Sequence, residues 1–191
     1  MMNTSFTLKN TLRGFLYNPL RKKRNFVTQF TRNLQNKNIM ELNAHNKQEY
    51  PPMHTCEHIV NRTMINLFGC GRAVSAHIER KKSKLDYALP QAPTEEEIQH
   101  LEDTVNEVIR RNLDVTTEFT TQQEAMDRFD LKRLPEGASE DVRIVKVGDY
   151  DECLCIGLHV ANTSEIGTFK IISHDYNEGI LRIRFKLIPN D

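Results

Sequence analysis

The residues best suited to chemistry form two pairs with the same spacing. In the segment MHTCEHIV, His54 and His58 lie four positions apart, and about a hundred residues later Cys155 and His159 repeat that separation. Side chains at i and i+4 of a helix share one face, roughly 6 Å apart at the base, so the first pair could bind one metal ion. Taken alone, such a pair is also what an ordinary helix surface carries.

Together the two pairs offer three imidazoles and one thiolate, a donor set that suits a tetrahedral zinc ion. The soft thiolate argues against magnesium or calcium. The competing interpretation is that Cys155 is a buried core thiol and His159 a loop histidine with satisfied hydrogen bonds. Which of the two holds depends on whether the fold brings the pairs together.

Hydrophobic periodicity predicts two principal helices. The first covers 53–68, after two consecutive prolines, and has apolar residues at helical spacing. The second is TEEEIQHLEDTVNEVIRRNL, which opens with a capping box of Thr94 and Glu97 and carries an apolar stripe.

The remaining segments alternate as strands do. We expect a hairpin from the runs 74–78 and 85–89, a strand at 115–119, a short helix opened by Thr121 and Glu124, a strand at 142–147, extended chain at 153–156 after a turn at 148–151, and a hairpin of 168–173 with 180–187. The pattern predicts an α+β protein: a mostly antiparallel sheet with two principal helices packed on one face.

The charge distribution predicts a boundary near residue 40. Residues 1–39 contain eight Lys or Arg and no Asp or Glu, whereas 40–191 contain 18 basic and 26 acidic residues. We therefore interpret 1–39 as a basic leader outside the fold and 40–191 as the zinc-binding domain. The leader fits an RNA-binding arm, an organellar presequence, or translated sequence upstream of a start at Met40.

The cysteines and the apolar runs indicate the compartment. Four cysteines in a chain without a secretory signal suggest a reducing environment, so we expect thiols or metal ligands rather than disulfides. The sequence has no apolar run near the ~20 residues that a membrane span requires. We expect a cytoplasmic protein with no membrane partner, with organellar targeting by the leader left open.

The motifs around both pairs resemble a known family. HTCEHIV, followed by a C-x-x-x-H segment that continues as VANTSEIG, resembles the editing domain of alanyl-tRNA synthetases and their free-standing relatives. It is also similar, more distantly, to the second additional domain of threonyl-tRNA synthetases. The resemblance runs from about Met53 to Leu187 and includes the segments FTTQQEA and IGTFKIIS.

The resemblance implies a zinc site made by His54, His58, Cys155 and His159. It also implies hydrolysis of the ester that joins a wrong amino acid to a tRNA 3′ end, so the expected partner is a mischarged tRNA acceptor end, with Ser-tRNA(Ala) or Gly-tRNA(Ala) as the expected substrate. No synthetase catalytic region is present in the sequence, so it looks like the short free-standing form, acting in trans.

The sequence departs from the family at the second motif. The family usually reads C-G-G-T-H-V, and here Ile156 and Leu158 replace a glycine and the threonine. The ligands remain, but a polar pocket lining becomes apolar. Two alternatives therefore stay open: a hydrolase of another mischarged tRNA or acyl ester, and a non-catalytic zinc module that binds RNA or protein.

Three residues near the ligands receive provisional roles. Thr55 is a candidate for reading a substrate hydroxyl, with helix N-terminal hydrogen bonding as the alternative. Glu57 lies between the histidines and is a candidate base, but the helix turn is expected to point it away from them into solvent. Cys153 is expected to be a bystander near the metal.

Four basic residues are candidates for tRNA contacts. Alternation on the last strand places Arg182, Arg184 and Lys186 on one face, and Arg62 adds charge on the first helix. The same pattern is typical of a solvated strand face, so the sequence does not decide between the two.

Overall fold

A computed structural model describes residues 50–131 and 139–190, which belong to one compact unit, 46–191. The predicted leader, 1–39, lies outside the described residues. The elements are α2 (Pro51–Phe68), β1 (Ser75–His77), β2 (Ser83–Ala88), α3 (Glu95–Arg110), β3 (Val115–Thr121), α4 (Gln122–Ala125), β4 (Asp141–Val147), β5 (Asp151–Leu154), the 3-10 helix η2 (Thr163–Glu165), β6 (Thr168–Asn177) and β7 (Ile180–Ile188).

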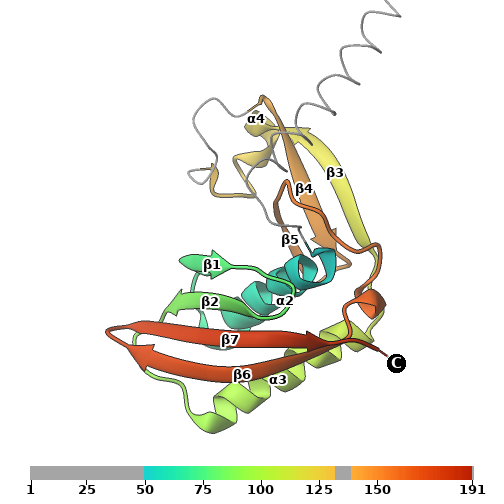
Figure 1. Ribbon diagram of the computed structural model, residues 1–191. Helices are drawn as coiled ribbons and strands as arrows, with labels where there is room; N and C mark the ends of the chain where they lie inside the picture. The colour runs from blue at the N-terminus through green and yellow to red at the C-terminus, as the bar shows by residue number, and fades with distance from the viewer. Residues whose placement is uncertain (1–49, 132–138, 191) are drawn as a thin grey trace, which may run out of the picture. The chain divides into compact units, whose positions relative to one another are not determined.

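The strands form two antiparallel sheets (Figure 1). One has four strands in the order β1-β2-β7-β6, and the other has three in the order β3-β4-β5. The predicted α+β class with antiparallel pairing and two principal helices is confirmed. Strand alternation alone does not separate the two sheets, because it reports which side of a strand is buried and not which strand lies beside it.

Helix α2 begins with two prolines and ends at a glycine. Pro51 and Pro52 occupy the first turn, where backbone N–H groups have no partner within the helix, so their missing donors cost nothing there. At the other end Gly69 adopts φ 62°, and its N–H donates to the carbonyl oxygen of Ile65 at 3.0 Å. A side chain would be strained at that φ, so Gly69 sets the helix end.

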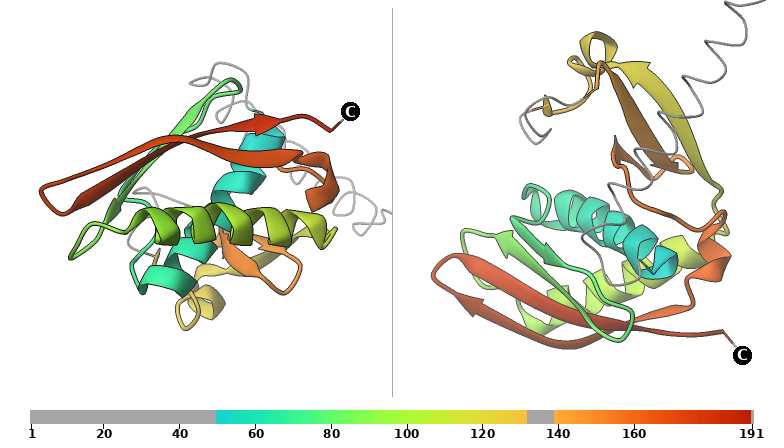
Figure 2. Two further views of the ribbon diagram at one scale, coloured as in Figure 1. Left: turned by 90° about the horizontal axis from the view of Figure 1, so that it is seen from below. Right: turned by 45° about the horizontal axis from the view of Figure 1, so that its top comes forward.

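Helix α3 begins with the predicted capping box. The side chain of Thr94 accepts from the N–H of Glu97, and the Glu97 carboxylate accepts from the N–H of Thr94. The apolar stripe is buried: Ile98, Leu101, Val105, Val108 and Ile109. Both long helices cover the same face of the four-stranded sheet, as the right-hand view of Figure 2 shows.

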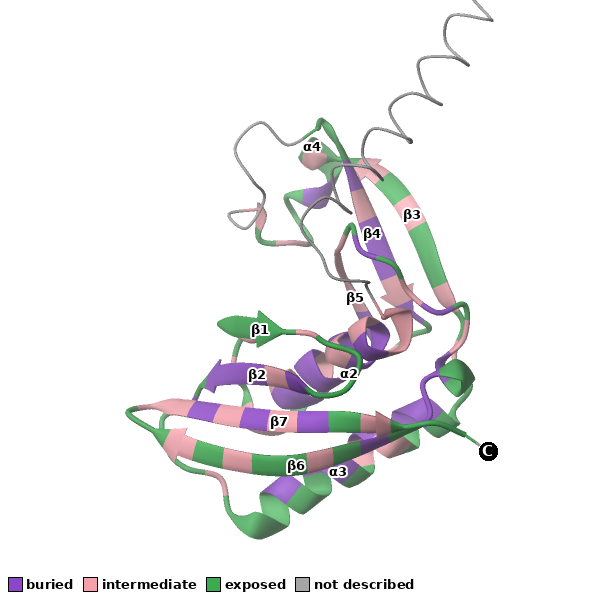
Figure 3. Ribbon diagram, viewed as in Figure 1, coloured by how far each residue is buried: buried purple, intermediate pink, exposed green. Residues whose placement is uncertain are grey.

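Strand β7 lies in the middle of the four-stranded sheet and alternates between core and outer face (Figure 3). Leu181, Ile183 and Phe185 are fully buried against the helices. Arg182 and Arg184 therefore lie on the opposite face, as the sequence alternation predicts.

Helix α3 also covers the free edge of β6. The side-chain amide of Asn106 donates to the carbonyl oxygen of Phe169 and accepts from its N–H, both at 2.9 Å. Two residues on, the N–H of Ile171 donates to the carboxylate of Glu102 at 2.7 Å. An edge strand exposes unpaired backbone groups, and here side chains of a helix satisfy them.

The three-stranded sheet positions β5 beside α2. The predicted short helix is present as α4, with the capping box of Thr121 and Glu124. The turn expected at 148–151 ends one residue earlier, because Asp151 is the first residue of β5 and its side chain is buried. Within the described ranges, no helix is long and apolar enough to cross a membrane.

We predict that Asn106→Ala lowers the free energy of unfolding by about 2 kcal/mol, since the buried backbone groups of Phe169 lose their partner. Urea unfolding followed by circular dichroism measures this. Glu107→Ala, an exposed change on the same helix, is the matched control and should have little effect. Equal stability of the two variants would show that Asn106 does not protect the edge.

Candidate metal centre

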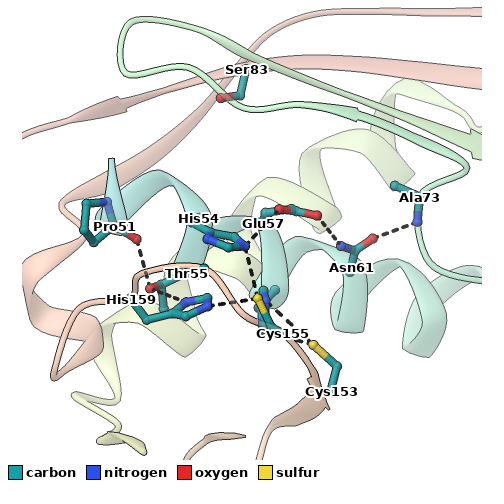
Figure 4. Close-up of polar contacts among 12 residues, drawn as sticks. Pro51, His54, Thr55, Glu57, Asn61, Ala73, Ser83, Cys153, Cys155 and His159 are labelled. Carbon is teal, nitrogen blue, oxygen red and sulfur yellow. Dashed lines mark hydrogen bonds and ion pairs between the residues drawn. The ribbon is translucent and has the colours of Figure 1, made fainter. Parts of the chain in front are cut away.

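The two sequence pairs meet at one place. His54 and His58 lie on α2, and Cys155 and His159 lie on the loop that follows β5, so segments a hundred residues apart face each other (Figure 4). The Sγ of Cys155 is 3.4 Å from Nε2 of His54 and 3.3 Å from Nε2 of His159. One ligand atom from each of the four residues lies within 4.8 Å of the other three.

These distances fit a single metal ion. Zinc bonds of about 2.3 Å to sulfur and 2.0–2.1 Å to nitrogen in a tetrahedron place the two donors roughly 3.6 Å apart. The two Cys155–histidine distances are within about 0.3 Å of that value. The arrangement can therefore hold a metal that prefers imidazole and thiolate ligands.

The histidine rings are crowded and poorly solvated. The centroids of His54 and His159 are 4.3 Å apart, and those of His58 and His159 are 4.5 Å apart. Burial, followed by the charges of His54 and Arg143, lowers the pKa of His159 to about 3. Burial and the neighbouring His159 and His54 also hold the pKa of His58 well below its usual range. Both rings are thus neutral at pH 7, the form that ligates metal.

Thr55 supports the ligand from the second pair. Its hydroxyl donates to the carbonyl oxygen of Pro51 at 3.0 Å, accepts from the N–H of Val160 at 3.2 Å, and lies 3.1 Å from Nδ1 of His159. With its single proton donated to Pro51, Oγ1 is an acceptor for an Nδ1–H, which leaves Nε2 of His159 free toward Cys155. The side chain is fully buried.

These contacts bear on the role predicted for Thr55. A hydroxyl has one donor position and two acceptor positions, and protein groups occupy all three in Thr55. Reading of a substrate hydroxyl stays a prediction, and the contacts favour the supporting role instead.

Glu57 does not point into solvent as expected. Its side chain is only 18% exposed, its Oε2 lies 3.8 Å from Nε2 of His54, and its Oε1 accepts from the side-chain amide of Asn61 at 3.3 Å. Burial raises the pKa of the Glu57 carboxyl, against the lowering effects of Asn61 and Arg72. Asn61 in turn accepts from the N–H of Ala73 (Figure 4). It also accepts from the hydroxyl of Tyr87 on β2, so a polar network links the site to the sheet.

Arg143 on β4 holds the loop that carries Cys155. Its Nη1 donates to the carbonyl oxygen of Gly157 at 2.6 Å and to that of Cys155 at 3.2 Å. The two residues that depart from the family, Ile156 and Leu158, are 61% and 53% exposed on this loop.

A second group of polar residues lies beside Nδ1 of His58. Asp151 and Cys153 are two residues apart on β5, and both approach Nδ1 of His58, at 3.7 Å from Oδ2 and 3.4 Å from Sγ. Cys153 is therefore close to a predicted ligand, and burial raises the pKa of its thiol to about 12. Two guanidinium groups, of Arg62 and Arg72, bind Oδ1 of Asp151 at 2.9 and 2.5 Å.

The sequence gives little sign of this second group. Asp151 follows a Gly-Asp-Tyr segment that is typical of a turn, and nothing local marks its burial. Strand alternation could have revealed this group, because Asp151 lies two residues before Cys153 and therefore on the same face of the strand.

Three of the four predicted tRNA-binding residues form ion pairs within the protein. Arg62 pairs with Asp151, Arg182 binds both carboxylate oxygens of Asp86 at 2.8 and 2.7 Å, and Arg184 binds Asp175 at 2.6 Å. Lys186 is exposed on β7. A tRNA contact by these residues stays a prediction.

Comparison with known proteins finds sequence similarity to one family of enzymes. Residues 142–184 match the family model described as the threonyl and alanyl tRNA synthetase second additional domain. The chain is 37% identical to the alanine–tRNA ligase of Fervidobacterium nodosum over 132 residues, 68% of this chain and 15% of that enzyme. It is 31% identical to the alanine–tRNA ligase of Streptococcus pyogenes over 137 residues, 71% of this chain and 16% of that enzyme. The chain thus spans less than a fifth of the length of these curated relatives.

We predict that Thr55→Val destabilises the metal-free protein by about 1–3 kcal/mol, because the buried N–H of Val160 loses its acceptor. Thr55→Ser, which retains the hydroxyl, is the matched control and should be destabilised less. Thermal unfolding with metal removed measures both. If valine matches serine, the hydrogen bonds of Thr55 do not stabilise this site.

Proposed function

The chain is related to the editing domain of alanyl-tRNA synthetases, and from this relationship we propose that it is a zinc-dependent hydrolase that deacylates mischarged tRNA in trans. The observation that carries the proposal is the meeting of His54, His58, Cys155 and His159. The proposed substrate is an alanine tRNA that carries serine or glycine, bound through its acceptor end.

The metal part of the proposal rests on the donor set. Three imidazoles and one thiolate with ligand atoms within 4.8 Å of one another suit zinc better than the oxygen-preferring cations. A zinc ion held by all four side chains would have no open position. If one ligand were displaced, or a fifth were added, the ion would supply Lewis-acid polarisation of an ester carbonyl or a position for the substrate amino group.

The proposed ester hydrolysis does not require a strong base. Hydrolysis consumes one water: its oxygen bonds to the ester carbonyl carbon, the ester C–O bond breaks, and the terminal ribose oxygen of the tRNA leaves with a proton. The chain positions the groups for this step, since Thr55 orients His159 and Arg143 holds the backbone at Cys155 and Gly157. Editing by hydrolysis is required because binding discriminates poorly between small side chains.

Ile156 and Leu158 favour a second candidate. Both are more than half exposed beside the ligands, where the family's pattern has a glycine and a threonine. Leu158 removes the threonine hydroxyl, which could have bound a polar substrate, and Ile156 adds a second branched apolar side chain. The same metal centre would then serve another mischarged tRNA or acyl ester.

The proposed contacts with tRNA phosphates come from the outer face of the four-stranded sheet. Arg182, Arg184 and Lys186 follow one another on β7, and Lys84 is paired in register with Arg184. The internal ion pairs of the two arginines lower their net charge, so Lys84 and Lys186 should contribute most to binding.

We predict that Cys155→Ala and His58→Ala each lower the zinc content from about one ion per chain, because each removes one of four ligands. Zinc is measured by mass spectrometry after dialysis against a weak chelator. Cys70→Ala is the matched control, since its thiol donates to the carbonyl oxygen of Met64 away from this group. Full zinc occupancy in the Cys155→Ala protein would contradict the assigned ligand set.

We predict that the full chain deacylates serine- or glycine-charged alanine tRNA and leaves correctly charged alanine tRNA intact. The release of labelled amino acid from a panel of mischarged tRNAs measures this. Turnover only on other charged tRNAs or on simple esters supports the reshaped hydrolase. Tight tRNA binding without turnover of any substrate would favour the non-catalytic module and overturn the proposal.

A further inference from the structure

The carboxylate of Asp151 has one oxygen that no hydrogen bond satisfies. Its side chain is completely buried, and among residues 50–131 and 139–190 Oδ2 is the one buried side-chain oxygen or nitrogen without a hydrogen-bond partner. A buried carboxylate oxygen left without a partner is costly, so its position calls for an explanation.

The other oxygen of Asp151 fixes where the unsatisfied one points. Oδ1 accepts from Nε of Arg62 at 2.9 Å and from Nη2 of Arg72 at 2.5 Å. Arg62 lies one helical turn beyond His58 on α2, and Arg72 also donates to the backbone oxygen of Glu152 at 3.2 Å. This clamp joins α2 to the start of β5 and leaves Oδ2 directed at the imidazole of His58, 3.7 Å from Nδ1.

A histidine that binds metal through one ring nitrogen generally donates a hydrogen bond from the other, often to a carboxylate. We propose that Asp151 is a positioning residue for the metal centre: its Oδ2 accepts the Nδ1 proton of His58 and so keeps the Nε2 lone pair available as a ligand. At 3.7 Å the two atoms lie just beyond hydrogen-bond distance, and roughly half an ångström of ring movement makes a hydrogen bond.

Cys153 fits the same role for this side of the ring. Its Sγ lies 3.4 Å from Nδ1 of His58, on the same side of β5 as Asp151. The same Sγ is 3.7 Å from Nε2, so it is slightly nearer to Nδ1. Nδ1 therefore faces two protein atoms that can accept a hydrogen bond from it, whereas a metal bound at Nδ1 would displace both. Thr55 stands in the same relation to Nδ1 of His159. Two of the ligands thus have a polar support behind them.

The group of His58, Asp151 and Cys153 does not suit a second metal ion, although its ligand atoms are close enough for one. Oδ1 of Asp151 is already engaged by two guanidinium groups, and their positive charges oppose a further cation nearby. A neutral imidazole has one nitrogen lone pair, so neutral His58 can ligate a metal at only one of the two sites. We therefore assign the group to the support of His58.

The inference rests on the metal-binding part of the proposed function, and its test does not use deacylation. The first measurement is the tautomer of His58 in the metal-free full chain, from long-range ¹H–¹⁵N correlation spectra assigned with a His58→Gln sample. We expect the proton on Nδ1. A proton on Nε2 in the unsubstituted protein overturns the proposal, whether or not any variant folds.

The second measurement is zinc affinity of the full chain in competition with a chromophoric chelator. Asp151→Asn should weaken zinc binding by about tenfold to a hundredfold. The substituted amide turns an N–H group toward Nδ1 of His58, because the two guanidinium groups retain the carbonyl oxygen. The same variant should therefore move the His58 proton to Nε2, which a merely structural role would not do.

Asp149→Asn is the matched control, since Asp149 pairs with Arg111 at an exposed position two residues away. Its zinc affinity should stay within about twofold of the unsubstituted protein. Unchanged zinc affinity in a folded Asp151→Asn protein overturns the inference while leaving the proposed function intact. A stoichiometry of two zinc ions per chain, lost to one in Asp151→Asn, would also overturn it in favour of a second metal site.

Discussion

Three imidazole rings are packed closely in a small, poorly solvated space. The chemistry of the site depends on this close packing, because it affects which rings carry a proton. The rings of His54, His58 and His159 have centroids 4.3–5.4 Å apart. A proton on one disfavours a proton on the next, and burial disfavours charge on His58 and His159. Their lone pairs are therefore available to a cation, and Cys155 adds a sulfur within 3.4 Å of two of the rings.

The fold maintains this crowding by using both sides of α2. One side is buried in the core of the four-stranded sheet, through residues such as Met53, Ile59 and Met64. The other side carries His58 and Arg62 toward β5, where Asp151 is bound by Arg62 and Arg72. Burial of one side fixes the helix, and the ion pairs on the other fix the position of β5 and of the loop beyond it.

Local signals in the sequence predicted much of this arrangement. Both capping boxes, the two hairpins and the i, i+4 spacing of His54 and His58 depend on residues close in sequence, and the structure contains them. The meeting of the two ligand pairs was inferred from their donor types and from a family resemblance. Periodicity alone gives no distance between segments a hundred residues apart.

The features that the sequence did not predict depend on long-range contacts. Asp151 looks like a turn residue until Arg62 of α2 and Arg72, which follows that helix, bind it. Glu57 looks solvated until the surrounding chain leaves its side chain only 18% exposed. Asn106 gives no sign in the sequence that it pairs with the backbone of Phe169, 63 residues away. The side chains of Asp151 and Asn106 each pair with groups that only the folded chain brings near.

The central claim is that these four side chains surround one zinc ion. X-ray absorption spectroscopy of the purified full chain, with metal content determined on the same sample, tests it most directly. The account predicts one zinc per chain with about three nitrogen ligands near 2.0–2.1 Å and one sulfur near 2.3 Å. A zinc shell without sulfur, or a chain that binds no zinc when it is supplied, would contradict it.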